Sequence, residues 1–265
     1  MITDAQRPVG FFTDSSLCIG CKACEVACKE WNQLPADGYE FLATSYDNTR
    51  SLSGTTWRHV AFVEAPGAGA PGAQQTWLML SDVCKHCEHA GCLQACPTGA
   101  IVRTEFNTVY IQQDVCNGCG YCVPACPYGV VDLSPVDHQA HKCTLCYDRQ
   151  RGGLEPACAK ACPTDSIQFG YLDELQAHAR QRLEELRQRG VGAARLYGLD
   201  EGAAKDERGE GTLGSLFLLL DEPERYNLPA RVELPQNTVV PSSVLTAAAG
   251  LLLWIGAAIA FGRKW

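Results

Sequence analysis

Residues 84–127 read CKHCEHAGCLQACPTGAIVRTEFNTVYIQQDVCNGCGYCVPACP, and this stretch decides the fold. It contains two groups of four cysteines, each ending in a Cys-Pro pair. The second group has the spacing C-x2-C-x2-C-x3-C, and the first widens one gap to four residues. Between the groups lie two short β-prone runs, 101–102 and 108–111, which we expect to pair as a small hairpin that joins two halves of one unit.

The grouping of cysteines in fours extends over the whole chain, because its sixteen cysteines fall into four quartets with none left over. The quartets are Cys18, Cys21, Cys24 and Cys28; Cys84, Cys87, Cys92 and Cys96; Cys116, Cys119, Cys122 and Cys126; and Cys143, Cys146, Cys158 and Cys162. Two of them keep the bacterial ferredoxin spacing, and the last widens one gap to eleven residues. This pattern predicts ligands of iron–sulfur clusters.

Cluster geometry explains the spacing. Three thiolates on a tight turn reach three iron corners of one cube, and the fourth ligand comes from another segment, commonly a cysteine that precedes proline. Cys96, Cys126 and Cys162 precede proline, whereas Cys28 precedes Lys29. Four thiolates per cube predict four [4Fe-4S] clusters, with iron bound through all sixteen cysteines.

Two other uses of cysteine fit less well. Disulfide-dense chains are typically small and secreted, but this chain has 265 residues and begins without an apolar signal-peptide core. Structural zinc uses paired C-x2-C units, which would leave half of each quartet without a purpose. Zinc still fits better than disulfides, so the non-enzymatic alternative is a zinc-stabilised interaction module anchored to a membrane.

Composition limits the partners and the core. The formal net charge is −8, which argues against a nucleic-acid partner. Apolar residues make up 46% of the chain. Four clusters would replace much of the apolar core of a domain of this size, so we expect the iron-free protein to be largely unfolded.

Residues 244–261, VLTAAAGLLLWIGAAIAF, form an uncharged apolar run. Its length predicts a single transmembrane helix within a terminal segment 238–265, with membrane lipid as its partner. Arg263 and Lys264 follow it, so the positive-inside rule places the C-terminus in the cytoplasm and the cluster domain on the extracytoplasmic (periplasmic) face. Export would then require a partner subunit that carries the signal. Without such a partner, the cluster domain would face the cytoplasm.

Several other segments have readable local patterns. A strand is expected over 166–170 and an amphipathic helix over 172–189, with Asp173 and Glu174 at its start and Gly190 after its end. Residues 65–73 and 200–211 read as loops, and residues 147–157 read as a surface loop inside the last quartet.

Spacing alone does not decide which quartets share clusters. The second and third quartets, on either side of the hairpin, make a natural pair, which leaves the first to pair with the fourth. The third and fourth are nearly as close in sequence, so that pairing stays open.

The chain resembles the beta, iron–sulfur subunits of membrane-bound respiratory formate dehydrogenases. The resemblance rests on residues 18–32, CIGCKACEVACKEWN; on Thr56-Trp57-Arg58; and on HKCTLCYDR at 141–149 and EPACAKACPT at 155–164. It continues in Asp221-Glu222-Pro223-Glu224-Arg225-Tyr226 and the terminal segment, and so covers nearly the whole chain.

The resemblance implies a nested set of ligands. Cluster 1 would be held by Cys18, Cys21, Cys24 and Cys162; cluster 2 by Cys28, Cys143, Cys146 and Cys158; cluster 3 by Cys84, Cys87, Cys92 and Cys126; and cluster 4 by Cys96, Cys116, Cys119 and Cys122. The implied fold class is α+β, with two ferredoxin-like units of two [4Fe-4S] clusters each, related by a pseudo-twofold axis and carrying loop insertions, plus the C-terminal transmembrane helix.

The implied domains are a four-cluster domain over 1–170, a packing segment over 171–237 and the anchor over 238–265. Within the first, one unit comprises 84–130 and the other 14–30 with 139–170. Electrons would enter at cluster 1 from a catalytic alpha subunit with a molybdenum or tungsten bis-pterin and a [4Fe-4S] cluster. They would leave at cluster 4 toward a membrane cytochrome b gamma subunit that reduces quinone.

No constellation typical of a catalytic site stands out, so the chain is expected to be a non-catalytic electron-transfer subunit. The same role in a membrane-bound hydrogenase or another pterin oxidoreductase is the alternative. His86 and His89 lie inside a complete quartet and are expected near the ligands or at the surface, not as ligands. Lys85 and Lys142 are adjacent to ligands and could raise a cluster potential by their charge, but the default expectation places them in solvent. Trp57 and Trp77 are expected to serve packing.

Overall fold

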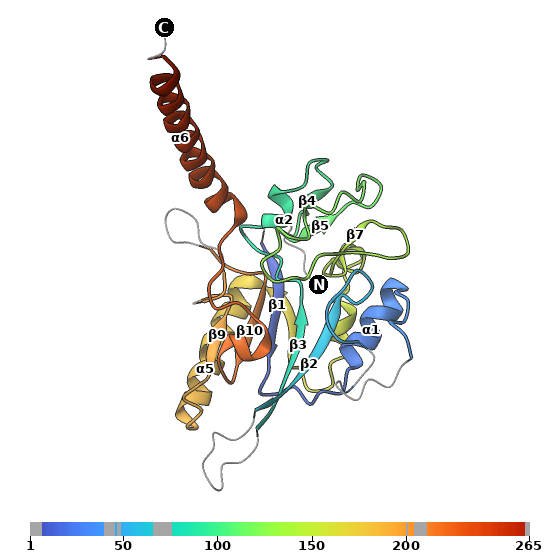
Figure 1. The fold of residues 1–265 in the computed structure, drawn as a ribbon. Coiled ribbons are helices and arrows are strands. Elements are labelled where there is room, and N and C mark those ends of the chain that lie inside the picture. The colour runs from blue at the N-terminus through green and yellow to red at the C-terminus, as the bar shows by residue number, and fades with distance from the viewer. Residues whose placement is uncertain are drawn as a thin grey trace. The chain divides into compact units, whose positions relative to one another are not determined.

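The computed structural model describes residues 7–39, 46, 49–65, 76–199, 201–203 and 211–262, without the side chains of residues 65, 76, 235–242, 260 and 262. The chain divides into two units, Met1–Val232 and Glu233–Trp265. The first unit contains all the cysteines, and it is described first (Figure 1).

A four-stranded sheet gathers segments from both ends of the chain. Its strands are β1 (Val9–Asp14), β8 (Ile167–Tyr171), β9 (Arg195–Tyr197) and β10 (Ser215–Leu219), in the order β8-β1-β10-β9. The central pair, β1 and β10, is parallel, and the other two pairs are antiparallel. All side chains of β1 and β10 are buried, as expected for central strands covered on both faces.

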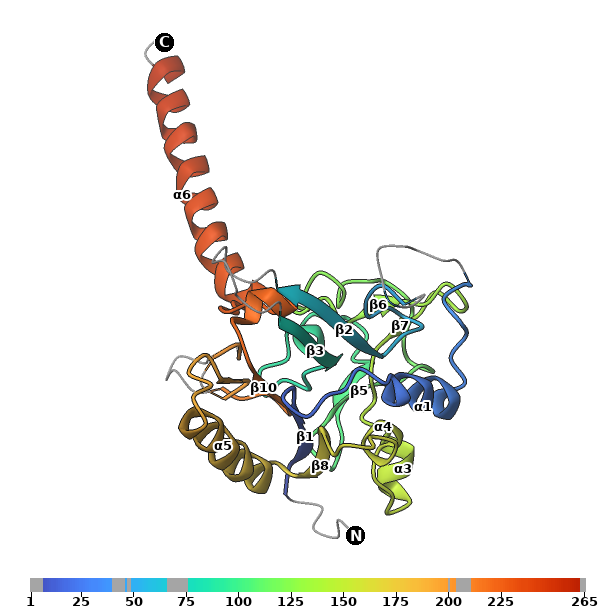
Figure 2. The same ribbon diagram turned by 90° about the horizontal axis from the view of Figure 1, so that it is seen from below.

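Helix α5 (Leu172–Gln188) covers one face of this sheet, as Figure 2 shows. Its buried residues lie at helical spacing, and Phe12 of β1 packs against them. The preceding residue on β1, Phe11, belongs instead to the core that contains the cysteines. Because successive side chains of a strand point to opposite faces, β1 separates the apolar core under α5 from the cysteine-rich core.

The cysteine-rich part consists of hairpins and short helices. The hairpins pair β2 (Arg58–Ala65) with β3 (Thr76–Val83), β4 (Ile101–Arg103) with β5 (Val109–Ile111), and β6 (Asp132–Leu133) with β7 (Ala140–His141). The helices are α1 (Ala23–Asn32), α2 (Gly91–Gln94), α3 (Tyr147–Arg151), α4 (Ala157–Lys160) and the 3-10 helix η1 (Pro223–Tyr226). Helices α1 and α4 pack against each other (Figure 2).

Most of the local predictions agree with this structure. The hairpin between the second and third quartets is confirmed as β4 and β5, and the helix expected over 172–189 is confirmed as α5. The strand expected over 166–170 is shifted by one residue. The segment 147–157 is not a simple loop, because it starts with α3 and leads into α4. Residues 66–73 of the first predicted loop, and residues 200 and 204–210 of the second, lie outside the described residues.

The second unit contains helix α6 (Pro235–Gly262). The predicted membrane anchor is wrong, and with it the predicted location in the cell membrane and its sidedness. Over the residues that the structure describes, no helix combines the length and the apolar character needed to cross a bilayer.

Candidate iron–sulfur sites

All sixteen cysteines are described, and none forms a disulfide. Among the described residues, no three His, Cys, Asp or Glu side chains surround one point closely enough to bind a single metal ion. The thiols instead gather in four groups of four.

The first group lines one pocket and consists of Cys18, Cys21, Cys24 and Cys162. Burial raises the pKa of Cys18, and the nearby thiolates of Cys162 and Cys21 add to the rise. Cys21 is exposed to solvent, so this group reaches the surface.

The second group is the most deeply buried. Burial raises the pKa of Cys28 well above its ordinary value, and the thiolates of Cys143, Cys158 and Cys146 contribute. All four side chains are buried. Helix α1 supplies Cys28 and helix α4 supplies Cys158, so the packing of these two helices brings together the first and last quartets.

The third group surrounds Cys87. Burial raises the pKa of Cys87 well above its ordinary value, and the thiolates of Cys84, Cys92 and Cys126 act in the same direction.

The fourth group, Cys96, Cys116, Cys119 and Cys122, lines a second pocket. Burial raises the pKa of Cys122 to about 11, with a contribution from the other three thiolates. Cys119 is exposed. The four neighbourhoods have the same membership as the four ligand sets expected from the resemblance.

The groups also follow one another in space. Thiolates of adjacent groups raise one another's pKa: Cys158 acts on Cys24, Cys84 acts on Cys143, and Cys122 acts on Cys92. The first group therefore adjoins the second, the second adjoins the third, and the third adjoins the fourth.

The surrounding backbone suits clusters that carry negative charge. The N–H of Leu145 lies 3.2 Å from the sulfur of Cys143. Although burial raises it, the pKa of Cys96 lies below its ordinary value because the Thr98 hydroxyl and nearby backbone N–H groups donate to the sulfur. Hydrogen bonds to sulfur are also a means of setting cluster potentials. The residues present thus fit [4Fe-4S] clusters.

Turn geometry in the third quartet depends on glycine. Gly118 has φ +72°, and a Cβ there would lie 2.4 Å from the carbonyl oxygen of His138. A side chain at this position would force apart the loop that presents Cys116 and Cys119, so the glycine is required for the close approach.

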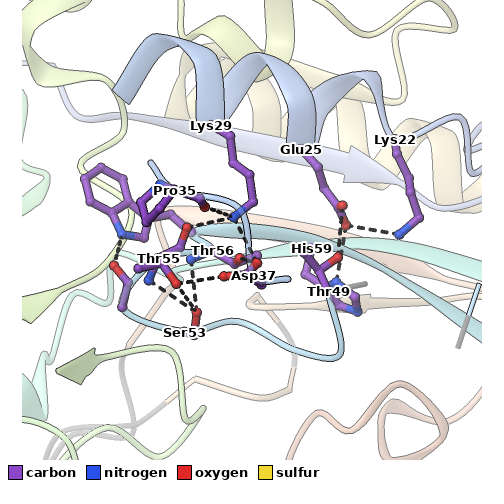
Figure 3. A network of polar contacts seen from close by, with 12 residues as sticks. Lys22, Glu25, Lys29, Pro35, Asp37, Thr49, Ser53, Thr55, Thr56 and His59 are labelled. Carbon is purple, nitrogen blue, oxygen red and sulfur yellow. Dashed lines mark hydrogen bonds and ion pairs between the residues drawn. The ribbon is translucent and has the colours of Figure 1, made fainter. Parts of the chain in front are cut away.

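Figure 3 shows how α1 is held against the β2–β3 region. Glu25 lies between Cys24 and Cys28 in the sequence, and it accepts a hydrogen bond from the backbone N–H of Val60 and lies 3.2 Å from His59 Nδ1. One turn later, Lys29 bonds Asp37 at 2.9 Å and the carbonyl oxygen of Thr55 at 3.0 Å. Because these contacts fix α1, they also fix the positions of Cys24 and Cys28 in two adjacent groups.

Three charged residues beside the thiols were misjudged or missed from sequence. Lys85 and Lys142 are buried, although we expected them in solvent. Lys85 pairs with Asp82, whereas Lys142 donates to the backbone carbonyls of Val109 and Cys143. Arg58 is buried among the first two groups, and only its place in the Thr56-Trp57-Arg58 motif pointed to it.

The histidines and tryptophans considered in the sequence analysis lie among packed or partly exposed side chains. Buried His86 accepts a hydrogen bond from the N–H of Val109, and burial holds its pKa well below the ordinary value. His89 is partly exposed. The Trp57 indole donates to the carbonyl oxygen of Gly54 at 2.9 Å and stacks on His141. Trp77 is half exposed and packs against Phe62.

Comparison with known proteins agrees with this geometry. A family model described as a 4Fe-4S dicluster domain matches residues 75–172, and a second model of the same description matches residues 17–100. Together with the sixteen cysteines, these matches fit four [4Fe-4S] clusters.

Individual relatives show more closely which family the chain belongs to. The formate dehydrogenase iron–sulfur subunit of Haemophilus influenzae is 38% identical over 94% of this chain and 78% of its own length. The iron–sulfur subunit of the nitrate-inducible formate dehydrogenase of Escherichia coli is 38% identical over 97% of this chain and 80% of its own length. The B subunit of the anaerobic dimethyl sulfoxide reductase of Escherichia coli is 37% identical over only 63% of this chain and 75% of its own length. The chain belongs to the family of formate dehydrogenase iron–sulfur subunits, which transfer electrons and are not themselves the catalytic subunits.

Proposed function

We propose that this chain relays electrons from a formate-oxidising subunit to an electron-accepting subunit of the same complex. The donor would carry a molybdenum or tungsten pterin, and the acceptor would be a cytochrome b that reduces quinone. The observation that carries the proposal is the unbroken succession of four thiol groups with an exposed cysteine in the first and in the last. Such an arrangement would allow electrons to enter at one exposed group and to leave at the other.

The proposed ligand sets are those implied by the family resemblance, and the thiol neighbourhoods support them. When bound, the clusters supply one-electron transfer, and the protein residues provide spacing, burial and charge. Residues 1–170 are proposed as the four-cluster domain and 171–237 as a segment that packs on it. The pairing of β10 with β1 supports that packing.

Exposed apolar residues lie beside both ends of the succession. Ile19 is 59% exposed next to the first group, and Tyr121 is 64% exposed next to the fourth. We propose that the surface around Ile19 contacts the formate-oxidising subunit and the surface around Tyr121 contacts the acceptor. The direction follows from the family resemblance.

The partner is the main point to test, because no residue here contacts formate. The iron–sulfur subunits of formate dehydrogenases align over 91–97% of the chain, whereas the dimethyl sulfoxide reductase subunit aligns over 63%. That difference favours a formate-oxidising partner over another pterin oxidoreductase or a hydrogenase. Purification of the intact complex and identification of its large subunit should yield a pterin subunit that oxidises formate. Any other large subunit would contradict the proposal.

A Cys122→Ser variant tests the relay itself. We expect it to lose or convert the cluster in the fourth group and to stop quinone reduction, while formate oxidation by the large subunit with an artificial dye continues. Val123→Ala, which changes the neighbouring side chain and keeps all thiols, is the matched control and should retain both activities. Unchanged iron content and quinone reduction in the Cys122→Ser variant would refute the ligand assignment.

A further inference from the structure

Arg58, the first residue of β2, is buried at 1% exposure in the cysteine-rich core. Its Nη1 donates to the side-chain oxygen of Ser81 at 3.0 Å and more weakly to the Ser81 carbonyl at 3.4 Å. Its guanidinium carbon lies 4.8 Å from the centre of the Phe11 ring. These contacts hold the guanidinium in one place without neutralising its charge.

The charge of Arg58 is only partly compensated by the polypeptide. Nε and Nη2 are both buried and have no hydrogen-bond partner among the residues that the structure describes. Within the same residues, no carboxylate forms an ion pair with Arg58. Burying an unpaired charge is very costly, so a group of opposite charge must complete this site.

The charges of thiolates from two adjacent groups act on the guanidinium. Burial alone would lower the pKa of Arg58, but the charges of Cys158, Cys24, Cys143 and Cys28 raise it above its ordinary value. Cys24 belongs to the first proposed set, and the other three belong to the second. Ser81 ties Arg58 to the first group directly, because its side-chain oxygen also lies 3.2 Å from the sulfur of Cys24.

Lys85, another cation buried beside thiols, is arranged differently. It contacts the carboxylate of Asp82, so it brings little net charge to the third group. An arginine keeps its charge at every accessible pH and offers several N–H donors in a fixed plane. Arg58 therefore combines a permanent charge with free donors at the junction of two cluster sites.

We propose that Arg58 is a positioning residue that acts as a counter-charge shared by the first two cluster sites and raises the reduction potentials of both. The inference rests on the ligand sets proposed above. Reduction adds negative charge to a cluster, and a fixed positive charge close by stabilises the reduced form more than the oxidised one. Removing the charge should therefore make both clusters harder to reduce.

The test is a redox titration of the full chain, followed by electron paramagnetic resonance, on proteins shown to hold sixteen irons. In Arg58→Met, two of the four reduction equilibrium constants should fall at least tenfold, which is about 59 mV for a one-electron couple. The other two should stay within twofold. Arg58→Lys keeps the charge and should shift all four by less than Arg58→Met shifts the affected pair.

The outcomes separate this inference from the proposed function. Sixteen irons with unchanged potentials in Arg58→Met would overturn the counter-charge role and leave the relay intact. An equal shift of all four potentials would overturn it as well, because a shared charge at one junction acts locally.

Should Arg58→Met fail to bind its iron, a spectroscopic test replaces it. Protein labelled with nitrogen-15 arginine and reduced stepwise should show a weak nitrogen coupling to cluster spins that disappears in Arg58→Lys. A coupling that is absent, or that persists in Arg58→Lys, would refute the placement of Arg58 between the two sites.

Discussion

The two inner thiol groups differ from the two outer ones in burial and in nearby charge. Six of the eight cysteines of the second and third groups are buried and none is exposed, whereas the first and fourth groups together have two buried and two exposed cysteines. The buried cations Lys85 and Lys142 lie beside the inner groups, and buried Arg58 lies between the inner second group and the outer first group. The second and third groups are thus shielded from solvent, whereas the first and fourth groups reach the surface. This is expected for a relay that exchanges electrons only with partner subunits.

Removing one ligand should have the largest effect where the surroundings are most buried. Cys143→Ser, in the inner second group, should lower the iron content by more than four per chain, because that group adjoins two others and lies in the folded core. Cys119→Ser, at the exposed end, should lose at most four irons and leave the other three clusters intact. Iron and acid-labile sulfide analysis checks both. Equal iron loss in the two variants would break the distinction between inner and outer sites.

Lys142 offers a second test of the buried charges. Its ammonium donates to the carbonyl oxygen of Cys143 at 3.0 Å, and its charge acts on Cys92 of the third group. Lys142→Met should lower the reduction equilibrium constants of the second and third clusters by about tenfold, or roughly 59 mV. Redox titration should find the potentials of the first and fourth clusters little changed. Lys142→Arg keeps the positive charge, so it should leave the second and third potentials close to those of the parent protein. A variant with sixteen irons and four unaltered potentials would show that this cation is purely structural.

Glu25 tests how α1 links an outer group to an inner one. Burial raises the pKa of Glu25, but the contact with His59, the hydrogen bond from the Val60 N–H and the charge of Lys22 outweigh it and hold the pKa below its ordinary value of 4.5. Because the folded pKa is depressed, the carboxylate stabilises the fold above pH 4.5, and this contribution is lost as the pH falls through the folded pKa.

Glu25→Gln should therefore destabilise the protein at pH 7.5 by about 1–3 kcal/mol, and the difference from the parent should shrink below pH 4.5. Thermal unfolding under anaerobic conditions measures it. A difference of the same size at all pH values would show that the charge of Glu25 is not the cause. Gln33→Ala, at the exposed end of α1, serves as the control and should change little.

The smallest effect on the chain itself should come from the surfaces beside the exposed cysteines. Ile19→Ser and Tyr121→Ser should each change the free energy of unfolding by no more than about 0.5 kcal/mol, since both side chains are largely exposed. Ile19→Ser should weaken binding to the formate-oxidising subunit, and Tyr121→Ser should not. Quantitative co-purification tests this. The reverse pattern would mean that the electron path runs in the opposite orientation.

The sequence could predict what depends on local spacing. The quartets Cys84–Cys96 and Cys116–Cys126, the hairpin between them and helix α5 are each encoded within a few dozen residues, by thiol spacing, β-branched runs and helical periodicity. Apolar character alone did not suffice at the C-terminus, where an uncharged run predicted a membrane span that the described part of α6 does not support.

Tertiary structure decided what depends on distant segments. The pairing of β1 with β10 joins Phe11 to Ser215 across the chain, and neither strand was expected from sequence. The burial of Arg58 and Lys142 depends on what packs around them, since a cationic side chain reads as solvated until its surroundings are known. Spacing fixes how one loop presents its thiols, whereas long-range packing fixes which loops face each other and which charges lie between them.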